Sequence, residues 1–494
     1  MKVSDIILFA FLAVSCAGVG NVPSSDANVR CYEPDMTSLV RNPLSGWTIY
    51  EDANGVISDA ASYWSRQDMV ARRFSSIFYF RTRWSALEPQ EGQYAWEHDE
   101  NIKALIQGAL DRGLKLAFCV YVDGQDNICN ATPDFVREAG AEGYQVHRLW
   151  DPADTNDNWT PYADDPVFQE KFSNFIAAFA KEFDDPDRVD YVDAFNLGWW
   201  GEGHHIQYKD PANKGTVFQW IVDLYGSNFK NVMLITNFGT EMGIELEKRF
   251  AIDGQGYAIR RNSLASTWFR DTEINTVCSL FPDVPFVAES CYWGSFDDNY
   301  QPWTEDPLYG NVFKSWVDVY KQVYDDALRS HANTLDLRGV TEARGWTGRA
   351  LELVKGFISY GGYRLTPILV EYDETLYRGE ALKIRHVWKN SGVGVCPNNN
   401  IRWNYKYKVA FAMVSGEDIL LKYVDEVTDP SDWIYGADTE YISEFSVELP
   451  SGDYALWVCV ADTSKEDDPP GLRLAVKGGK FTDGWLNVGN INIR

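Results

Sequence analysis

Short β-rich runs alternate with amphipathic helical stretches from about residue 40 to residue 360. This alternation constrains the fold strongly, because it is the pattern of a parallel sheet whose strands are joined by helices. The predicted strands cover residues 46–50, 77–84, 114–122, 189–197, 232–236, 256–259, 284–288 and 332–337. Eight strand–helix units over about 320 residues match a (β/α)8 TIM barrel with inserted loops. We therefore predict an α/β barrel over residues 40–362, closed by a helix over residues 347–360.

The sequence after Gly362 has a different character. Short alternating runs, among them residues 381–388 and 454–460, are separated by turns such as Pro-Ser-Gly-Asp at 450–453. Alternation with turn signals and without helical periodicity predicts an all-β sandwich over residues 363–494. Because no long linker separates the two parts, we expect the sandwich to pack against the barrel.

The first twenty residues have the pattern of an export signal. Lys2 supplies a positive charge, and residues 6–14 form an apolar stretch too short to span a bilayer. The sequence Ser-Cys-Ala-Gly at 15–18 resembles the bacterial lipobox, in which the cysteine is lipidated. We expect residues 1–20 to hold a lipoprotein signal peptide with Cys16 as the lipidation site, followed by a tether over residues 21–39. Cleavage without lipidation is the alternative.

This signal predicts an exported protein, an outer-membrane lipoprotein at the cell surface or in the periplasm. Its only expected contact with a membrane is the lipid anchor, since no later stretch approaches the ~20 apolar residues of a spanning helix.

Charge and aromatic content narrow the expected partners. The 72 acidic residues outnumber the 45 lysines and arginines and give a net charge of −27. Such a field repels a phosphate backbone, so nucleic-acid binding is not expected. Aromatic residues make up 15% of the chain, and their flat apolar rings pack well on the C–H faces of sugars. A carbohydrate is therefore the expected partner.

Two glutamates follow predicted barrel strands in aromatic surroundings. Glu202 lies in Trp-Trp-Gly-Glu-Gly-His at 199–204, after the fourth strand. Glu289 directly follows the seventh strand and precedes Ser-Cys-Tyr-Trp. Barrel enzymes carry their catalytic groups at the carboxyl ends of the strands, and glycosidic-bond hydrolysis needs two carboxyl groups on either side of the bond. Glu202 and Glu289 are therefore the predicted catalytic pair.

This layout resembles the clan-A glycoside hydrolases. More narrowly, the segments 42–47, 79–92 and 200–204, with Trp-Lys-Asn-Ser-Gly-Val at 388–393, resemble an uncharacterised family of Bacteroidetes-type lipoproteins with a glycosidase-like barrel. The resemblance implies a retaining enzyme in which Glu202 is the acid/base and Glu289 the nucleophile. It also implies that Arg81, and with it Arg83, holds the nucleophile ionised.

One position departs from the clan-A pattern. Most members have Asn immediately before the acid/base, bound to the sugar 2-hydroxyl, whereas this chain has Gly201. Either Asn196 or His204 is expected to replace that contact, or else the geometry differs.

Other side chains at predicted strand ends complete the candidate site. The expected substrate-binding residues are Arg81, Arg83, Asn196, Trp199, Trp200, His204, Asn237, Arg260, Tyr292 and Trp293, and Asn262 lies at a strand end beside Arg260. His204 and His205 could be ligands of a metal ion, but the sequence shows no third ligand at a suitable spacing. Asp123, Asp126 and Asn130 lack the pattern of a calcium loop. We predict no metal and no cofactor.

The resulting hypothesis is a retaining glycoside hydrolase that uses two glutamates on an oligo- or polysaccharide. An inverting hydrolase, with carboxyl groups about 6.5–9.5 Å apart, is one alternative. The other is a non-catalytic, glycan-binding surface lipoprotein on the same scaffold. Glutamates turned from the cleft, or bound in salt bridges, would favour this second alternative.

Overall fold

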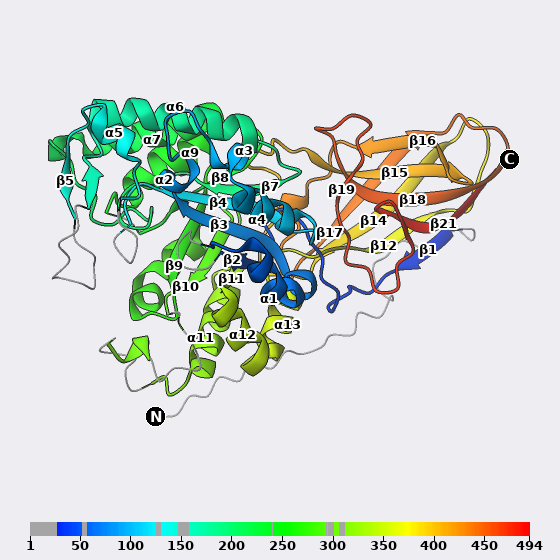
Figure 1. The fold of residues 1–494 in the computed structure, drawn as a ribbon. Coiled ribbons are helices and arrows are strands. Elements are labelled where there is room, and N and C mark those ends of the chain that lie inside the picture. The colour runs from blue at the N-terminus through cyan, green and yellow to red at the C-terminus, as the bar shows by residue number, and fades with distance from the viewer. Residues whose placement is uncertain are drawn as a thin grey trace.

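The computed structural model describes residues 27–51, 57–124, 130–146, 158–239, 241–292, 294, 301–305 and 312–494. The larger part is a closed barrel of parallel strands surrounded by helices, and the C-terminal part is an all-β domain beside it (Figure 1). The prediction of a TIM barrel followed by a β-sandwich is confirmed.

The barrel strands follow one another around the sheet in chain order, and β11 closes the circle by pairing with β2. In that order they are β2 (Gly46–Tyr50), β3 (Ser75–Arg83), β4 (Lys115–Tyr121), β7 (Val189–Asp193), β8 (Met233–Asn237), β9 (Ala258–Leu264), β10 (Phe286–Ser290) and β11 (Ala332–Arg338). A small hairpin, β5 (Gly143–Gln145) with β6 (Trp159–Pro161), lies between β4 and β7.

Helices cover the outside of the barrel. The main ones are α1 (Ala60–Arg73), α4 (Glu100–Leu110), α6 (Pro166–Phe183), α7 (Lys214–Asn228), α10 (Ile274–Leu280), α11 (Trp316–Arg329), α12 (Val340–Arg349) and α13 (Leu351–Tyr360). Shorter helices are α2 (Trp84–Leu87), α3 (Ala95–His98), α5 (Asp134–Glu138), α8 (Ile244–Leu246) and α9 (Asp253–Gln255).

The longest of these helices, α6, shows how the sequence defines the outer layer. The Asp165 carboxylate caps it by accepting bonds from the Val167 and Phe168 amides, and Pro166 occupies the first turn, where no donor is needed. Its buried phenylalanines recur every three or four residues and line the face that packs on the strands. They are Phe168, Phe172, Phe175, Phe179 and Phe183.

Three element boundaries differ from the predicted ones. The strand predicted at 189–197 ends at Asp193, and the chain then turns through Asn196, which has a positive φ of 58°. The weak strand predicted at 256–259 is the longer β9. The last helix is two helices that break at Ala350, where φ is −136°.

The C-terminal domain contains two sheets. One has the order β1-β12-β14-β17 and the other follows β13-β21-β18-β15-β16, with β19 and β20 paired at its sides. The strands are β12 (Leu365–Asp373), β13 (Thr375–Leu376), β14 (Ala381–Asn390), β15 (Tyr407–Ser415), β16 (Asp418–Asp425), β17 (Asp438–Ser446), β18 (Gly452–Asp462), β19 (Pro470–Leu472), β20 (Phe481–Thr482) and β21 (Trp485–Ile493).

The first strand, β1 (Ala27–Cys31), pairs antiparallel with β12. Part of the segment predicted as a tether, residues 21–39, is therefore a strand of the C-terminal domain. The chain enters this domain before it builds the barrel.

The interior of the barrel and the sandwich share one cluster of buried apolar residues. Tyr79, Tyr191 and Met233 inside the barrel belong to the same cluster of buried residues as Trp388 and Phe411 of the sandwich. The sandwich thus closes the end of the barrel at which the strands begin.

Polar contacts reinforce this closed end. The Arg402 guanidinium donates to the carbonyl oxygens of Phe229 (2.5 Å) and Val232 (3.1 Å), just before β8. The Asn333 amide of β11 donates to the Val395 carbonyl oxygen at 2.7 Å. The prediction that the sandwich packs directly on the barrel agrees with these contacts.

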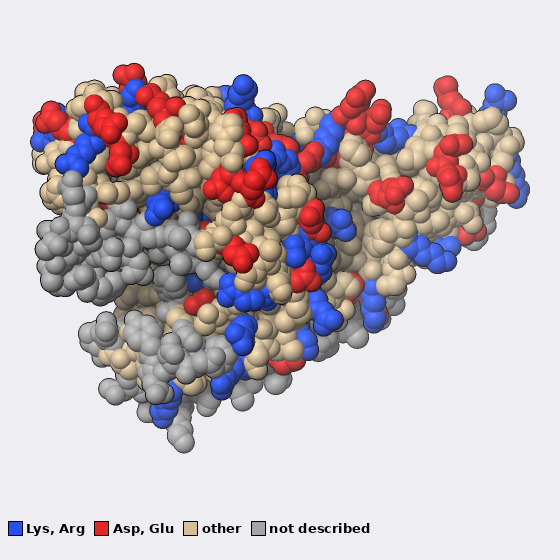
Figure 2. Space-filling model, in the orientation of Figure 1, with Lys and Arg blue, Asp and Glu red and all other residues tan. Residues whose placement is uncertain are grey.

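Acidic and basic side chains are interspersed over the face drawn in Figure 2. Among the described helices, none combines the length and the apolar composition needed to cross a bilayer.

Candidate active site

The two predicted catalytic glutamates lie together at the carboxyl end of the barrel. Glu289 is the penultimate residue of β10, and Glu202 lies in the loop that follows β7. Both are almost completely buried, with 4% of Glu202 and 2% of Glu289 exposed. A buried carboxylate is costly unless cations or hydrogen-bond donors surround it, so their partners define the site.

The loop that carries Glu202 is compact and unusually rich in left-handed backbone. Positive φ angles occur at Asn196, Gly198, Trp200, Gly201, Gly203 and His205. The Trp199 amide donates to the His204 carbonyl oxygen (2.8 Å), and the Glu202 amide donates to that of Trp199 (2.9 Å). The glycines in this segment let the chain turn tightly enough to direct Glu202 inward.

Gly201, the departure from the clan-A pattern, has a local explanation. Its φ is +73°, and a Cβ atom there would lie 3.1 Å from the Tyr121 Cβ and 3.2 Å from both the Asn196 Cα and the Cys119 Sγ. The position is thus too tight for an Asn without movement of its neighbours.

Arg260 connects the two glutamates. This arginine of β9 is fully buried, and its Nη2 forms an ion pair with the Glu289 Oε2. Its Nη1 lies 3.6 Å from the Glu202 Oε1 and donates to the Asn237 Oδ1 at 3.0 Å. One guanidinium therefore lies between both carboxylates.

Glu202 is bound on both of its oxygens. The Arg81 Nη2 lies 2.9 Å from Oε1, and the Asn262 side-chain amide donates to Oε2 at 2.5 Å. The His204 Nε2 lies 3.8 Å from Oε2. Burial raises the pKa of Glu202, but the charges of Arg81 and Arg260 outweigh it and hold the pKa below its ordinary value.

Glu289 is held by a second arginine. The Arg338 Nη2, at the end of β11, donates to the Glu289 Oε1 at 2.6 Å and to the Ser290 carbonyl oxygen at 2.5 Å. The Arg338 Nε donates in turn to the Asp336 Oδ2 at 2.7 Å. Glu289 therefore has one arginine on each oxygen.

The role implied for Arg81 needs correction. The resemblance assigned it to the nucleophile Glu289, but its ion pair is with Glu202, because β3 lies on the β7 side of the barrel mouth. Glu289 is instead bound by Arg260 and Arg338 from the flanking strands. Arg83 ends β3 with its side chain partly exposed.

The two residues proposed to replace the missing Asn differ in position. Asn196 is fully buried. Its side-chain oxygen accepts a hydrogen bond from the Tyr225 hydroxyl, and its side-chain nitrogen donates to the Cys119 Sγ. Both ends of the amide therefore have partners inside the protein. This finding argues against Asn196 as a sugar ligand. His204 lies beside Glu202, with 27% of its side chain exposed.

The aromatic candidates differ in their exposure. Trp199 and Trp200 pack edge to face with their ring centroids 5.7 Å apart, and both are partly exposed next to Glu202. Tyr292 is buried and packs on Phe313. Trp293 and the predicted lipidation site Cys16 lie outside the described residues.

The site contains residues that the sequence analysis did not single out. These are Arg338 and Asp336 of β11 and Asp193 at the end of β7. Arg338 directly follows the eighth predicted strand, 332–337, so its place at the strand end was the available signal. Within the described residues, no group of three or more His, Cys, Asp or Glu side chains could hold a metal ion.

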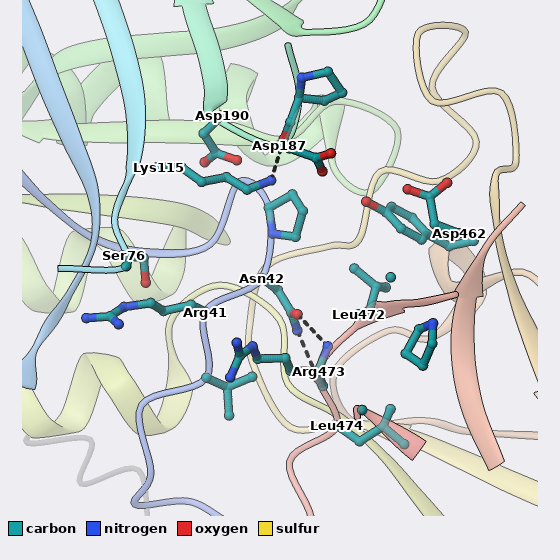
Figure 3. A pocket seen from close by; sticks show the side chains of 18 of the residues that line it. Arg41, Asn42, Ser76, Lys115, Asp187, Asp190, Asp462, Leu472, Arg473 and Leu474 are labelled. Carbon is teal, nitrogen blue, oxygen red and sulfur yellow. Dashed lines mark hydrogen bonds between the residues drawn. The ribbon is translucent and has the colours of Figure 1, made fainter. Parts of the chain in front are cut away.

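A large cavity of about 1110 Å³ lies at the opposite end of the barrel (Figure 3). It is lined by the starts of barrel strands, among them Lys115 and Asp190, and by sandwich residues such as Asp462 and Arg473. Since the strands begin here, this cavity is separated from the two glutamates by the length of the barrel.

Neither a protein-family model nor a curated protein matches the chain. Among solved structures, the catalytic domain of β-amylase from Paenibacillus polymyxa is similar over 64% of this chain and 98% of its own, with 9% identity and a TM-score of 0.42. Endo-glycoceramidase II from Rhodococcus sp. is similar over 85% of this chain and 100% of its own, with 13% identity and a TM-score of 0.39.

A glycoside hydrolase family 30 endoxylanase from Clostridium papyrosolvens gives 10% identity and a TM-score of 0.37, over 83% of this chain and 96% of its own. These neighbours are glycoside hydrolases with low sequence identity to this chain. Likenesses of this size do not assign an activity or a substrate.

Proposed function

We propose that this protein is a retaining glycoside hydrolase with Glu202 as the acid/base and Glu289 as the nucleophile. The observation that carries the proposal is the pairing of two buried carboxylates, at the carboxyl ends of β7 and β10, across the single guanidinium of Arg260. A retaining mechanism needs its carboxyl groups only about 5–5.5 Å apart, and a shared guanidinium supports such a short separation.

The reaction would begin with Glu289. Its carboxylate attacks the anomeric carbon and forms an ester, while Glu202 transfers its proton to the departing glycosidic oxygen. Arg260 and Arg338 keep Glu289 ionised and aligned for this attack. Water then attacks the same carbon, Glu202 accepts its proton, and the Glu289 carboxylate leaves.

Arg260 has a specific part in this sequence. The first step removes the negative charge of Glu289 and creates one on Glu202, and both groups adjoin Arg260. The guanidinium therefore has a carboxylate beside it in both states. A fixed counter-ion requires little reorganisation as the charge moves, and that lowers the barrier.

The partly exposed Trp199 and Trp200 support a carbohydrate as substrate, because such rings can pack on the apolar face of a sugar. We also propose, from the lipobox-like segment around Cys16, that the protein is exported and lipid-anchored. On the same grounds, we propose that it belongs to the Bacteroidetes-type lipoprotein family.

A second candidate function is glycan binding without catalysis. The observation that favours it is the set of arginine contacts around both glutamates, together with the lowered pKa of Glu202. An acid catalyst must be protonated when the substrate is bound, whereas a lowered pKa favours the ionised form. A binding protein would have no such requirement.

The experiment is hydrolysis of a panel of nitrophenyl glycosides and polysaccharides by wild type, Glu202→Gln and Glu289→Gln. The matched control is Glu273→Gln, whose carboxylate is bound to Arg261 at the same end of the barrel. We expect hydrolysis of at least one substrate, reduced by several orders of magnitude in the first two variants only. Glycan binding by wild type without hydrolysis would instead support the second candidate.

A further inference from the structure

Beneath Arg260 lies a third carboxyl group, that of Asp193. It is the last residue of β7 and is fully buried. Its Oδ2 accepts a hydrogen bond from the Tyr79 hydroxyl at 3.2 Å and another from the Arg260 Nη1 at 3.4 Å. Its Oδ1 is buried and has no hydrogen-bond partner among the described residues.

Asp193 and Glu202 meet at the same nitrogen atom. The Arg260 Nη1 lies 3.4 Å from the Asp193 Oδ2 and 3.6 Å from the Glu202 Oε1. An ionised Asp193 places a negative charge beside the nitrogen that faces Glu202, and it offsets part of the attraction that Arg260 exerts on an ionised Glu202. The ionisation of one carboxyl group therefore opposes the ionisation of the other.

The charges around the site lead to the same conclusion. Three arginines, Arg81, Arg260 and Arg338, face four carboxyl groups, those of Asp193, Glu202, Glu289 and Asp336. In a buried cluster an unbalanced negative charge is costly, and Asp193 and Glu202 are the two carboxyl groups that face the same nitrogen of Arg260. The proposed hydrolysis requires a proton on Glu202.

We propose that Asp193 is a positioning residue which acts through Arg260 to increase the proton affinity of Glu202, so that Glu202 can serve as the acid. This inference rests on the proposed function. Asp193 does not touch the reacting atoms; its carboxylate holds Arg260 and reduces the stabilisation that Arg260 gives to an ionised Glu202.

The surroundings of Asp193 fit this role. Burial raises its pKa to about 6, Arg260 and Arg81 oppose the rise, and Glu202 adds to it. The other titratable groups that interact with it are Tyr79 on β3, Cys119 on β4, Tyr191 on β7 itself and Tyr225 on α7. Because each of these two carboxyl groups opposes ionisation of the other, the pair loses its last proton as the pH rises through about 6.

Asp193→Asn tests the proposal, because an Asn retains an oxygen that can accept from Tyr79 and Arg260 but carries no charge. The rate constant kcat/KM should fall at high pH as the Asp193–Glu202 pair loses its last proton, whereas in the variant Glu202 titrates without this partner. We expect the midpoint of this fall to move to lower pH in the variant, by about one unit, which is a tenfold lower kcat/KM on that limb. A merely structural role would lower the rate at every pH without moving the midpoint.

Asp190→Asn is the matched control. Asp190 lies on the same strand, is also buried and has its pKa raised by burial to about 6, but it is at the far end of the barrel (Figure 3). We expect this variant to keep the wild-type midpoint. An unchanged midpoint in Asp193→Asn, or an equal shift in Asp190→Asn, would overturn the proposal.

A second measurement needs no substrate. Melting temperatures of wild type, Asp193→Asn, Glu202→Gln and the double variant form a cycle that isolates the coupling between the two carboxyl groups. We expect the shifts in Tm to be non-additive at pH 7 and additive at pH 4, where Asp193 is protonated. The cycle built from Asp190→Asn and Glu202→Gln should be additive at both.

The two measurements separate the possible failures. A non-additive cycle in a protein that hydrolyses no substrate would leave the coupling intact and contradict only the proposed function. An additive cycle at pH 7 would contradict the role of Asp193, whatever the activity.

Discussion

At the scale of single residues, the site depends on arginines that reach the glutamates from both sides. Arg338 has a positive φ of 54° and forms charge-assisted hydrogen bonds with both Glu289 and Asp336. Strained backbone of this kind persists only where the surroundings stabilise it. Here the bonds of the guanidinium supply that stabilisation and fix the direction of Glu289.

Replacing Arg338 should misalign Glu289, the proposed nucleophile, more than it unfolds the protein. In Arg338→Lys the charge stays but the planar fork is lost, so we expect kcat to fall by about 100-fold because positioning within ~1 Å matters. Steady-state kinetics measure the effect. Arg385→Lys, which breaks a similar forked pair with Glu440 in the sandwich, is the control and should keep its kcat. An unchanged kcat in Arg338→Lys would show that Glu289 does not need this arginine.

Gly201 offers a prediction about backbone geometry. In Gly201→Asn the new Cβ would lie within 3.2 Å of three neighbouring atoms at a φ of +73°, so we expect a loss of about 1–3 kcal/mol in the free energy of unfolding. Gly92→Asn is the control, because its φ is +72° and no atom lies within 4 Å of its Cβ position. Equal effects of the two substitutions in urea denaturation would contradict the steric explanation.

At the scale of elements, strand β7 carries a buried carboxyl group near each of its ends. Asp190 accepts the Leu44 amide on both oxygens, at 2.8 and 2.9 Å, and so fixes the segment that leads into the barrel. Asp193 faces the candidate active site at the other end. Each has its pKa raised by burial to about 6, so the folded state binds these protons more tightly than the unfolded state does.

This difference gives stability a defined pH dependence. As pH rises from about 4 to about 6, an unfolded Asp190 loses its proton while the folded one keeps it, so the free energy of unfolding falls across that window. Asp190→Asn cannot ionise and should lack this contribution, which is at most about 3 kcal/mol. Urea denaturation of wild type and variant at pH 4, 5 and 6 measures the difference. A constant difference across the series would contradict the assignment.

The elements could largely be predicted from the sequence, because the strand and helix periodicities are strong. The two glutamates could also be predicted, since each follows a buried strand. The left-handed turn at Asn196, which shortens β7, depends on tertiary bonds to Tyr225 and Cys119 that no local pattern contains. The pairing of Arg81 with Glu202, and of Arg338 with Glu289, depends on which strands are neighbours around the barrel.

At the scale of the whole molecule, the sandwich closes one end of the barrel and the site occupies the other (Figure 1). One cluster of buried apolar residues runs from the barrel interior into the sandwich, so separating the two domains would expose part of it. We therefore expect the two domains to unfold together, in one cooperative transition.

A substitution at Arg402 tests whether the two domains unfold together. In Arg402→Ala the carbonyl oxygens of Phe229 and Val232 lose a charged donor, and each such bond contributes about 1.5–3 kcal/mol. We expect a lower Tm in calorimetry with the transition still single. Arg66→Ala, an exposed position on α1, should leave Tm almost unchanged. Two separated transitions in the wild-type protein would contradict the shared core.

The most direct test of the central claim is to trap the glycosyl ester on Glu289. Wild-type protein would be incubated with a panel of activated 2-deoxy-2-fluoroglycosides and examined by intact mass and peptide mapping. We predict an added sugar mass on the peptide that contains Glu289, and no such adduct in Glu289→Gln. An adduct on another residue, or hydrolysis that inverts the anomeric centre without any adduct, would contradict the account.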